Sequence, residues 1–544
     1  MDIYKMQIHI EQAGTLKNLI TEAEKDTVTH LKISGLLNSK DFDVLDDMCT
    51  SYVEFDEDDN HIIDINEPPF LTDLDLGESS LIGKPYLGEF TYYSKLERFV
   101  CPKNLVGTHD VRVFEGSEYL KTVVIPETFK EFGYGTFSNC ERLEEINFPN
   151  SLEKIGSFSF SGTALKKVKI PAKVSSIGCA AFGGCQALEY FDIDTSNLIF
   201  TVMDGVLFSK DKAKLVAFPC GNKNKHYTVP EGVEIIGEGS FLDAQIETIA
   251  FPSTLKTIER WAFRVCESLK RLDIPDSVTE IGELAFEFCL ALNQVKLPDK
   301  ITILKEQTFG GGDKLKEIDI PPSVKIIEDT ALGWSDSLET IHLHNGLEVL
   351  NDLTQCKTLK NVVIPKTVKE IAAGIFRKSV NIKEIKLDEE NPYFCVVDGS
   401  LYSKYKTRLI AVPCNERKIF IIPEGVQIIE EFVFEGFEKL EEIVFPDSLQ
   451  EIGHRAFEGC KALKKMTFPK ALLSVDFRAF DNCNNLQVVE LLAVKPPKIT
   501  KLLTGGWKFF GNAGKLMLYV PKESLAAYKK AIGWKDIKNI EVLT

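Results

Sequence analysis

The chain has 544 residues, and its 44% hydrophobic and 10% aromatic content is typical of globular proteins and excludes wholesale disorder. Its 64 basic and 81 acidic residues give a net charge of −17, which repels phosphate groups and argues against nucleic acids and anionic membranes as main partners. No apolar run reaches the roughly 18 to 20 residues that cross a bilayer, so we expect no transmembrane segment.

Residues 1–69 precede the repetitive part of the chain and are predicted to cap it at the N-terminal end. Within them, Thr15–Glu24 suits a helix that opens at Thr15, and Val28–Ser34 suits a strand. The first residues, MDIYKMQIHIEQAG, lack a basic segment followed by an apolar stretch of about 7 to 15 residues, so we expect no signal peptide there. By composition alone, a cytoplasmic location is favoured.

An acidic segment, DEDDNHIIDINE, ends this N-terminal region and partly matches a calcium-binding loop. The candidate ligands are Asp56, Asp58, Asn60, Asp64 and Glu67. Such a loop needs glycine at its sixth position for a sharp turn, and here that position is His61. Two prolines follow Glu67, where the next helix should begin. A solvated acidic loop is therefore favoured over a calcium site.

From residue 70 to residue 492 the sequence repeats with a period of about 23 residues. An apolar residue followed by proline, or by a residue in its place, marks each repeat, and thirteen of the fifteen intervals are 21 to 24 residues long. The repeat reads L-x-x-I-x-[IF]-P-x-S-[VL]-x-x-I-G-x-x-A-F-x-x-C, as in LKRLDIPDSVTEIGELAFEFC from Leu269. This regularity indicates a repeat architecture.

Each repeat predicts one rung of a stacked structure. The opening L-x-x-I-x-I alternates with period two, which is typical of a strand, and proline ends that strand because it has no N–H to donate. V-x-x-I-G suits a second short strand, and A-F-x-x-C suits about one helical turn with Phe pointing inward. One unit of 23 residues cannot bury its own apolar side chains, but stacked units share a core. We expect a β-rich α/β leucine-rich-repeat solenoid with a parallel β-sheet on its concave face.

Two longer intervals, of 36 and 35 residues, contain the same kind of insertion. The insertions lie near residues 195–222 and 389–416, and they read VMDGVLFSKDKAKLVAFPC from Val202 and VVDGSLYSKYKTRLIAVPC from Val396. Each joins two apolar runs through Asp-Gly, so each is predicted to be an extra β-hairpin that projects from the solenoid. The hairpins either bind a partner or merely fill an irregular rung.

Cysteine recurs in the last position of the repeat. The cysteines in this slot are Cys140, Cys185, Cys266, Cys289, Cys460 and Cys483. Catalysis would need one activated thiolate beside a base rather than a column of thiols. We therefore interpret the slot as core, where cysteine acts as a small apolar residue. Neighbouring rungs are close enough for disulfides, but two inward side chains in parallel register rarely reach the required dihedral angle.

The polar positions of the first strands should face outward on the concave side and form the binding surface. They are Lys167, Lys169, Tyr190, Asp192, Arg271, Asp273, Gln294, Lys296, Glu317, Asp319 and His342, with Glu384 and Lys386 further along. The charges are mixed, and Tyr190 is the one obvious aromatic residue. Sugar-binding sites usually offer several aromatic platforms, so this surface favours a protein partner over a glycan.

Two histidines, His342 and His344, stand two apart on one predicted strand and should share a face with Asp319 of the preceding rung. Two imidazoles and a carboxylate can hold zinc, but exposed histidines without a ligand role are commoner, so we expect no metal site. The sequence contains no G-x-S-x-G, Walker or G-x-G-x-x-G motif and no arrangement that resembles a hydrolase triad. We expect neither enzymatic activity nor a cofactor.

The repeats closely resemble the BspA-type leucine-rich repeats of bacterial surface proteins. Residues Ala13–Met48 resemble the N-terminal cap of Bacteroides-type members, and Leu518–Ile540, within a predicted C-terminal cap at residues 493–544, resemble their C-terminal cap. The resemblance implies a surface adhesin that binds host matrix proteins or other cells, and we expect the chain to be a monomer. It also implies a cell-surface or secreted location, with the leader absent from this sequence and a cytoplasmic location as the alternative. A carbohydrate-binding accessory protein is the alternative function.

Overall fold

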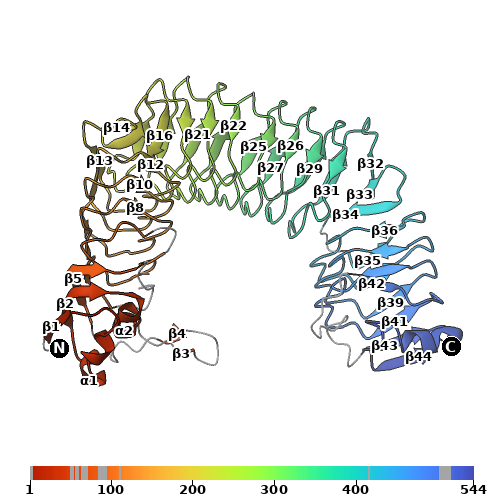
Figure 1. Ribbon diagram of the computed structural model, residues 1–544. Helices are drawn as coiled ribbons and strands as arrows, with labels where there is room; N and C mark the ends of the chain where they lie inside the picture. Colours follow the sequence, from red (N-terminus) through yellow and green to blue (C-terminus); the bar gives the residue numbers. More distant parts are fainter. Residues whose placement is uncertain are drawn as a thin grey trace. The chain divides into compact units, whose positions relative to one another are not determined.

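The computed structural model describes residues 4–49, 54–55, 61–62, 71–83, 95–108, 112–413, 417–500 and 516–543. The chain forms two compact units, Met1–Leu269 and Lys270–Thr544, hereafter unit 1 and unit 2. Each unit is a β-solenoid of stacked rungs with few helices (Figure 1). The prediction of a leucine-rich-repeat solenoid is therefore confirmed. The division falls inside residues 70–492, and the boundaries of the two caps stay predictions.

Each regular rung contributes two strands, one before the proline and one after it. In unit 1 the first strands are β6 (Arg98–Val100), β7 (Thr122–Val124), β9 (Glu145–Ile146), β11 (Lys167–Ile170), β13 (Tyr190–Ile193), β17 (His226–Thr228) and β19 (Thr248–Ala250). The second strands are β8 (Glu131–Phe132), β10 (Lys154–Ile155), β12 (Ser176–Ile177), β18 (Ile235–Ile236) and β20 (Thr257–Ile258). Paired neighbours in both sets run parallel, as β11 and β13 do.

Unit 2 repeats the arrangement. Its first strands are β21 (Arg271–Asp273), β23 (Gln294–Lys296), β25 (Glu317–Asp319), β27 (Thr340–His342), β29 (Asn361–Ile364), β31 (Glu384–Leu387), β35 (Ile419–Ile421), β37 (Glu442–Val444), β39 (Lys465–Phe468) and β41 (Val488–Leu491). Its second strands are β22 (Glu280–Ile281), β24 (Ile303–Leu304), β26 (Ile326–Ile327), β28 (Val349–Leu350), β30 (Glu370–Ile371), β36 (Ile428–Ile429), β38 (Glu451–Ile452), β40 (Ser474–Asp476) and β42 (Lys498–Thr500). Paired first strands are again parallel, as β25 and β27 are.

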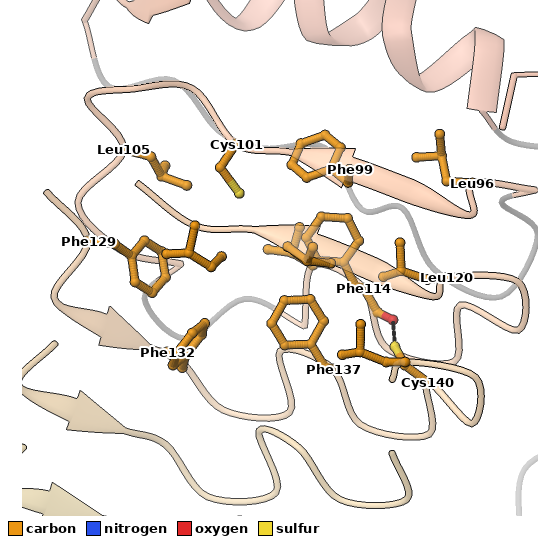
Figure 2. Close-up of a cluster of buried hydrophobic side chains, with 14 of the residues drawn as sticks. Leu96, Phe99, Cys101, Leu105, Phe114, Leu120, Phe129, Phe132, Phe137 and Cys140 are labelled. Atoms are coloured by element: carbon orange, nitrogen blue, oxygen red, sulfur yellow. Dashed lines mark hydrogen bonds between the residues drawn. The ribbon is translucent and has the colours of Figure 1, made fainter. Parts of the chain in front are cut away.

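Phenylalanines fill the core in a continuous row. In unit 1 the rings of Phe114, Phe137, Phe160 and Phe182 follow one another at centroid distances of 5.2, 5.5 and 5.5 Å. All four are buried, and Phe132 packs edge-on against Phe137 (Figure 2). One ring per rung therefore gives each of these four repeats an aromatic contact with its neighbours, which is how short units share one core.

The A-F-x-x-C segments differ from the predicted helical turn. Most are series of hydrogen-bonded turns with two residues in the left-handed region, such as Phe158 (φ 56°) and Gly162 (φ 72°). The N–H of Phe158 donates to the carbonyl of Cys179 in the next rung at 3.0 Å, whereas the N–H of Ser159 donates within its own rung to Gly156. Alternating N–H groups thus join neighbouring rungs, whereas a helix would use these groups within itself.

The two insertions are larger than the predicted hairpins. Each has three antiparallel strands: β14 (Phe200–Met203), β15 (Val206–Ser209) and β16 (Lys214–Ala217) in unit 1, and β32 (Phe394–Val397), β33 (Ser400–Ser403) and β34 (Arg408–Ala411) in unit 2. The last strand of each pairs in parallel with the following second strand, β16 with β18 and β34 with β36. Val206, Leu207 and Phe208 are fully buried. The middle strand therefore packs into the core rather than projecting from it.

The N-terminal region also differs in detail. Residues Thr15–Glu24 form a 3₁₀ turn η1 (Leu16–Asn18) and a helix α1 (Glu22–Lys25), which begins after a capping box at Thr21 instead of Thr15. The predicted strand is β2 (His30–Leu37), which pairs with β1 (Lys5–Ile10) and β5 (Asp73–Leu81), and α2 (Ser39–Cys49) follows β2. A short antiparallel pair joins β3 (Glu54–Phe55) to β4 (His61–Ile62).

The C-terminal region extends the first-strand sheet of unit 2. Strand β43 (Met517–Val520) pairs with β41, and β44 (Asn539–Val542) pairs with β43, both in parallel. Between them lie η2 (Lys522–Ser524) and α3 (Leu525–Tyr528). Tyr528 and Trp534 are fully buried, and each donates a hydrogen bond of 2.8 Å to a backbone carbonyl, so their polar atoms are satisfied inside the core.

Candidate functional site: the outer face of the first strands

The predicted surface residues do lie on the exposed face of the first strands, the face that points away from the core. This face is called the outer face below. In unit 1, Lys167 is opposite Tyr190 and Lys169 is opposite Asp192 across the parallel pair β11 and β13, and all four are exposed while Val168 and Phe191 between them are buried. The period-two alternation of the sequence places them there. In unit 2 the corresponding exposed positions belong to β21, β23, β25 and β27, and they include Gln294 on β23.

In unit 2 most of the predicted charges neutralise one another. Arg271 pairs with Asp273 at 3.1 Å on the same strand, and Lys296 lies 3.9 Å from Asp276. Glu384 and Lys386 pair at 3.4 Å. A ligand that used these side chains would have to replace existing partners, and exposed pairs of this kind contribute only about 0 to 1 kcal/mol each.

The two histidines do not share a ligand set. His342 Nε2 lies 2.6 Å from Glu317 Oε1, and His344 Nε2 lies 2.6 Å from Asp319 Oδ1, so each imidazole has a carboxylate of its own. In the part of the chain that the structure describes, no group of three His, Cys, Asp or Glu side chains is placed to hold a metal ion. The zinc alternative at His342, His344 and Asp319 thus has no support in the geometry.

The calcium alternative stays untested. Its candidate ligands Asp56, Asp58, Asn60, Asp64 and Glu67 lie outside the described residues.

In unit 1 the outer face is hollowed above β7, β9, β11 and β13. Two adjoining hollows, of about 680 and 380 Å³, share Ile146, Lys167 and Tyr190 in their linings. Tyr190 is 43% exposed, and Lys167 is in no ion pair among the residues that the structure describes. An exposed aromatic ring beside an unpaired ammonium group, on paired strands, is the arrangement most ready to receive a ligand.

Both hollows lie at a break in the first-strand sheet, between β9 and β11. The sheet that begins at β1 ends at β9, and β11 pairs only with β13. The side chain of Asn147 accepts a hydrogen bond from the N–H of Ile125 and donates one to its carbonyl, both at 2.7 Å. An amide side chain thus continues the contact between the rungs of β7 and β9 beyond their last paired residues.

Asp194 lines the smaller of the two hollows and is held there as a carboxylate. Hydrogen bonds from the hydroxyl and N–H of Ser196 lower the pKa of Asp194, and Lys169 adds a smaller effect. Asp192 accepts a hydrogen bond from the N–H of Ile193 at 2.8 Å. The hollow therefore carries fixed charges of both signs around an apolar floor.

The cysteine slot is core, as predicted, and also has a polar role. The thiol of Cys140 donates a hydrogen bond to the carbonyl of Phe114 in the preceding rung at 2.8 Å (Figure 2). Cys185 and Cys460 bond to Phe160 and Phe434 in the same way, at 3.0 and 3.2 Å. Burial raises the pKa of Cys140 to about 12, so the group is a thiol and not a nucleophile. The described cysteines form no disulfide.

Sequence reasoning missed an aromatic row on the turn side of unit 1. Tyr134, Phe158 and Trp261 follow one another at centroid distances of 5.7 and 5.7 Å. Arg112 stacks on Tyr134 at one end and Arg260 on Trp261 at the other, at 5.0 and 4.1 Å. Because an insertion separates Phe158 from Trp261 in sequence, spacing gives no sign that the rings meet.

The family profile described as "BspA type leucine rich repeat region" matches residues 108–224, 213–338, 279–395 and 413–505. These ranges cover more than half of the chain. The chain belongs to the BspA-type leucine-rich-repeat family. A search among curated proteins finds no match.

Several solved structures, most of them described as leucine-rich-repeat proteins, are similar to the chain. A leucine rich cell surface protein from Faecalibacterium prausnitzii is 24% identical, with a TM-score of 0.39, and the match covers 71% of this chain and 83% of that one. A leucine-rich repeat protein from Bacteroides ovatus is 24% identical over 82% and 92% of the two chains, with a TM-score of 0.38. The pneumococcal vaccine antigen PcpA is 20% identical over 63% and 98%, with a TM-score of 0.39.

Among the described residues of this BspA-type chain, none of the helices is both long and apolar enough to span a bilayer.

Proposed function

We propose that this BspA-type chain is a non-enzymatic interaction protein, on the cell surface or secreted, that binds host matrix proteins or other proteins through the outer face of its first strands. Family membership points to protein interaction or adhesion in general. The observation that carries the finer proposal is the hollow above β7 to β13, with Tyr190 exposed and Lys167 in no ion pair among the described residues. Tyrosine and charged residues at the centre of a rigid hollow are typical of binding hot spots.

The test is surface plasmon resonance of the purified chain against a panel of matrix proteins. The variant Lys167→Ala/Tyr190→Ala should lose at least tenfold in affinity for any matrix protein that binds. The matched control is Arg271→Ala/Lys296→Ala, which changes two exposed residues of unit 2 that already pair with neighbouring carboxylates. Equal losses in the two variants, or no binding to any matrix protein, would contradict the proposal.

The insertions can be tested by point substitutions. Leu198 and Tyr405, at exposed edges of the two insertions, are the most solvent-exposed large apolar side chains in the described residues. Because the middle strands are buried, deleting the insertions would disrupt the core, whereas Leu198→Ser/Tyr405→Ala should leave the fold intact. If this variant loses matrix binding and Lys167→Ala/Tyr190→Ala keeps it, the insertions and not the hollow form the binding site.

A carbohydrate partner is the second candidate, and the row of Tyr134, Phe158 and Trp261 favours it. Ring faces stack against the C–H groups of sugars, and Arg112 and Arg260 add hydrogen-bond donors at the two ends. A glycan array with the wild-type chain and Trp261→Ala tests this alternative. Glycan binding that Trp261→Ala removes would support this alternative. No binding of the wild-type chain to any glycan would contradict it.

A further inference from the structure

A column of residues with left-handed backbone follows the turns of unit 2. It takes one residue from each of five consecutive turns, all with φ between 55° and 73°: Phe288, Gly311, Trp334, Gln355 and Lys378. The N–H of each of the first four donates to the carbonyl directly before the next one, as from Trp334 to Thr354 at 3.2 Å. These hydrogen bonds hold the five positions in line, and the set is called the turn column below.

Trp334 lies at the centre of the turn column and presents an open ring. It is 38% exposed, and among the described residues its indole N–H donates no hydrogen bond and its ring contacts no other aromatic ring and no cation. Its φ of 57° is strained for a bulky residue, whereas glycine fills the same position of other turns at Gly162 and Gly436. Strain of this kind is concentrated at ligand sites.

Phe288 provides a second ring two turns away. It is 39% exposed, and a Cβ at Gly311 would lie 2.5 Å from its ring, so the ring lies over this glycine. Neighbouring rungs are about 4.8 Å apart, so the backbones of Phe288 and Trp334 are roughly 10 Å apart. Because Gly311 has no side chain, the ring of Phe288 leans into the space between the two backbones.

Polar groups continue the column beyond Trp334. The amide of Gln355 and the ammonium group of Lys378 have no side-chain hydrogen bond or ion pair in the part of the chain that the structure describes. Both can donate hydrogen bonds to a ligand that lies on the two rings, and the amide can also accept one.

The charges around the column are of both signs. Of those directly before a column residue, Glu287 is buried and Arg377 pairs with Glu435 at 2.6 Å. The exposed charges within three residues after a column residue are two carboxylates and two ammonium groups, Asp313, Lys314, Asp336 and Lys357. Asp336 and Lys357 pair with each other at 2.8 Å. The ring faces and the amide, rather than charge, therefore define the ligand.

We propose that the turn column of unit 2 binds a neutral oligosaccharide, with one pyranose ring stacked on Trp334 and a second on Phe288. The C–H groups of a pyranose pack on aromatic ring faces, while the indole N–H of Trp334 and the amide of Gln355 bond to its hydroxyl groups. Because the two rings belong to turns that are two rungs apart, two or more linked sugars are needed to cover both. This site is separate from the hollow of unit 1 and goes beyond the proposed protein binding.

The probes are four fluorescein-labelled neutral trisaccharides, namely maltotriose, cellotriose, chitotriose and mannotriose, with acidic sialyllactose for comparison. Fluorescence anisotropy with the full chain should detect binding of at least one neutral trisaccharide. Trp334→Ala should weaken this binding at least tenfold, and Gln355→Ala should weaken it about threefold. The matched control is Trp261→Ala, because the ring of Trp261 in unit 1 already contacts Phe158 and Arg260, and it should leave the affinity unchanged.

Intrinsic fluorescence separates contact with the sugar from a structural role of Trp334. The chain has four tryptophans, and a saturating unlabelled trisaccharide should change the emission of the wild-type chain through Trp334. Trp334→Phe keeps a ring face but loses the N–H, so it should retain part of the affinity and lose the emission change. This measurement still decides if Trp334→Ala fails to fold in a far-UV circular dichroism melt.

Four results would overturn the inference. They are no binding of any neutral trisaccharide, binding of sialyllactose alone, an equal loss of affinity in Trp261→Ala and Trp334→Ala, and an emission change that persists in Trp334→Phe. Lys167→Ala/Tyr190→Ala should bind the trisaccharide as the wild-type chain does, and a loss there would place the sugar in the hollow of unit 1 instead.

Discussion

Asp352 in unit 2 is fully buried, and its Oδ2 atom has no hydrogen-bond partner among the described residues. Burial, with a smaller contribution from Asp329, raises the pKa of this carboxyl from 3.8 to about 6, although the hydroxyl and N–H of Thr354 act in the opposite direction. The folded chain therefore holds the neutral acid more readily than the unfolded chain does. This contribution to stability is complete below pH 3.8 and is lost as the pH rises through about 6.

We predict that wild-type unit 2 becomes less stable between pH 5 and pH 8 by roughly 1.4 kcal/mol from this residue alone. Asp352→Asn has no proton to lose and should remove that part of the pH dependence. Urea unfolding of both chains at pH 5 and pH 8 measures the difference. The same loss of stability in both chains would mean that Asp352 does not titrate in this range.

The phenylalanine row gives a second test at the scale of single residues. Phe286 is buried and stacks on Phe309 at 5.3 Å, so Phe286→Ala should cost about 3 to 5 kcal/mol. Lys296→Ala, on the outer face, should change the free energy of unfolding by less than about 0.5 kcal/mol. Denaturant unfolding compares the two, and similar values would show that the assignment of inner and outer positions is wrong.

At the scale of elements, the turns differ most from what the sequence predicts. The consensus A-F-x-x-C has a helix-like spacing, but one of its two left-handed positions is held by Phe158, Trp261 or Thr330 and only sometimes by glycine. Phe, Trp and Thr are not residue types that indicate a positive φ, so a pattern of apolar positions cannot predict this turn. The strands could be predicted because alternation and proline act locally, within five or six residues.

Two adjacent glycines in one turn, Gly310 and Gly311, test the assignment of left-handed positions. Gly311 has φ +73°, and a Cβ there would lie 2.5 Å from the ring of Phe288, whereas a Cβ at Gly310 would meet its nearest neighbour at 3.6 Å. Gly311→Ala should therefore destabilise unit 2 by about 1 to 2 kcal/mol or more. Gly310→Ala should be close to neutral, or stabilising by about 0.5 kcal/mol. Thermal unfolding of the two variants provides the comparison, and equal midpoints would contradict the left-handed geometry.

The candidate site could be predicted only in part. Alternation correctly places Lys167, Tyr190, Arg271 and His342 outward. It cannot reveal that Arg271 and His342 already have partners, nor that the sheet breaks beside Lys167, because both depend on contacts between rungs. The aromatic row is invisible for the same reason.

At the scale of the whole molecule, contacts in a solenoid run from each rung to its neighbours, so a local defect should stay local. Phe434 is buried in unit 2 and stacks on Phe457 at 5.0 Å. In Phe434→Ala, amide hydrogen exchange should become faster in β35, β37 and β39 and stay unchanged in β7, β9 and β11 of unit 1. Faster exchange throughout both units would instead show that the chain unfolds as one cooperative body.

The thiol-to-carbonyl bonds of the cysteine slot bear on where the protein can work. With a pKa of about 12, Cys140 is ionised at neutral pH in only about one molecule in 10⁵, and oxidants and alkylating agents react with the thiolate. The cysteines of the core should therefore resist air, peroxide and iodoacetamide as long as the chain is folded. The thiols of this slot thus survive in an oxygenated medium without disulfides to protect them.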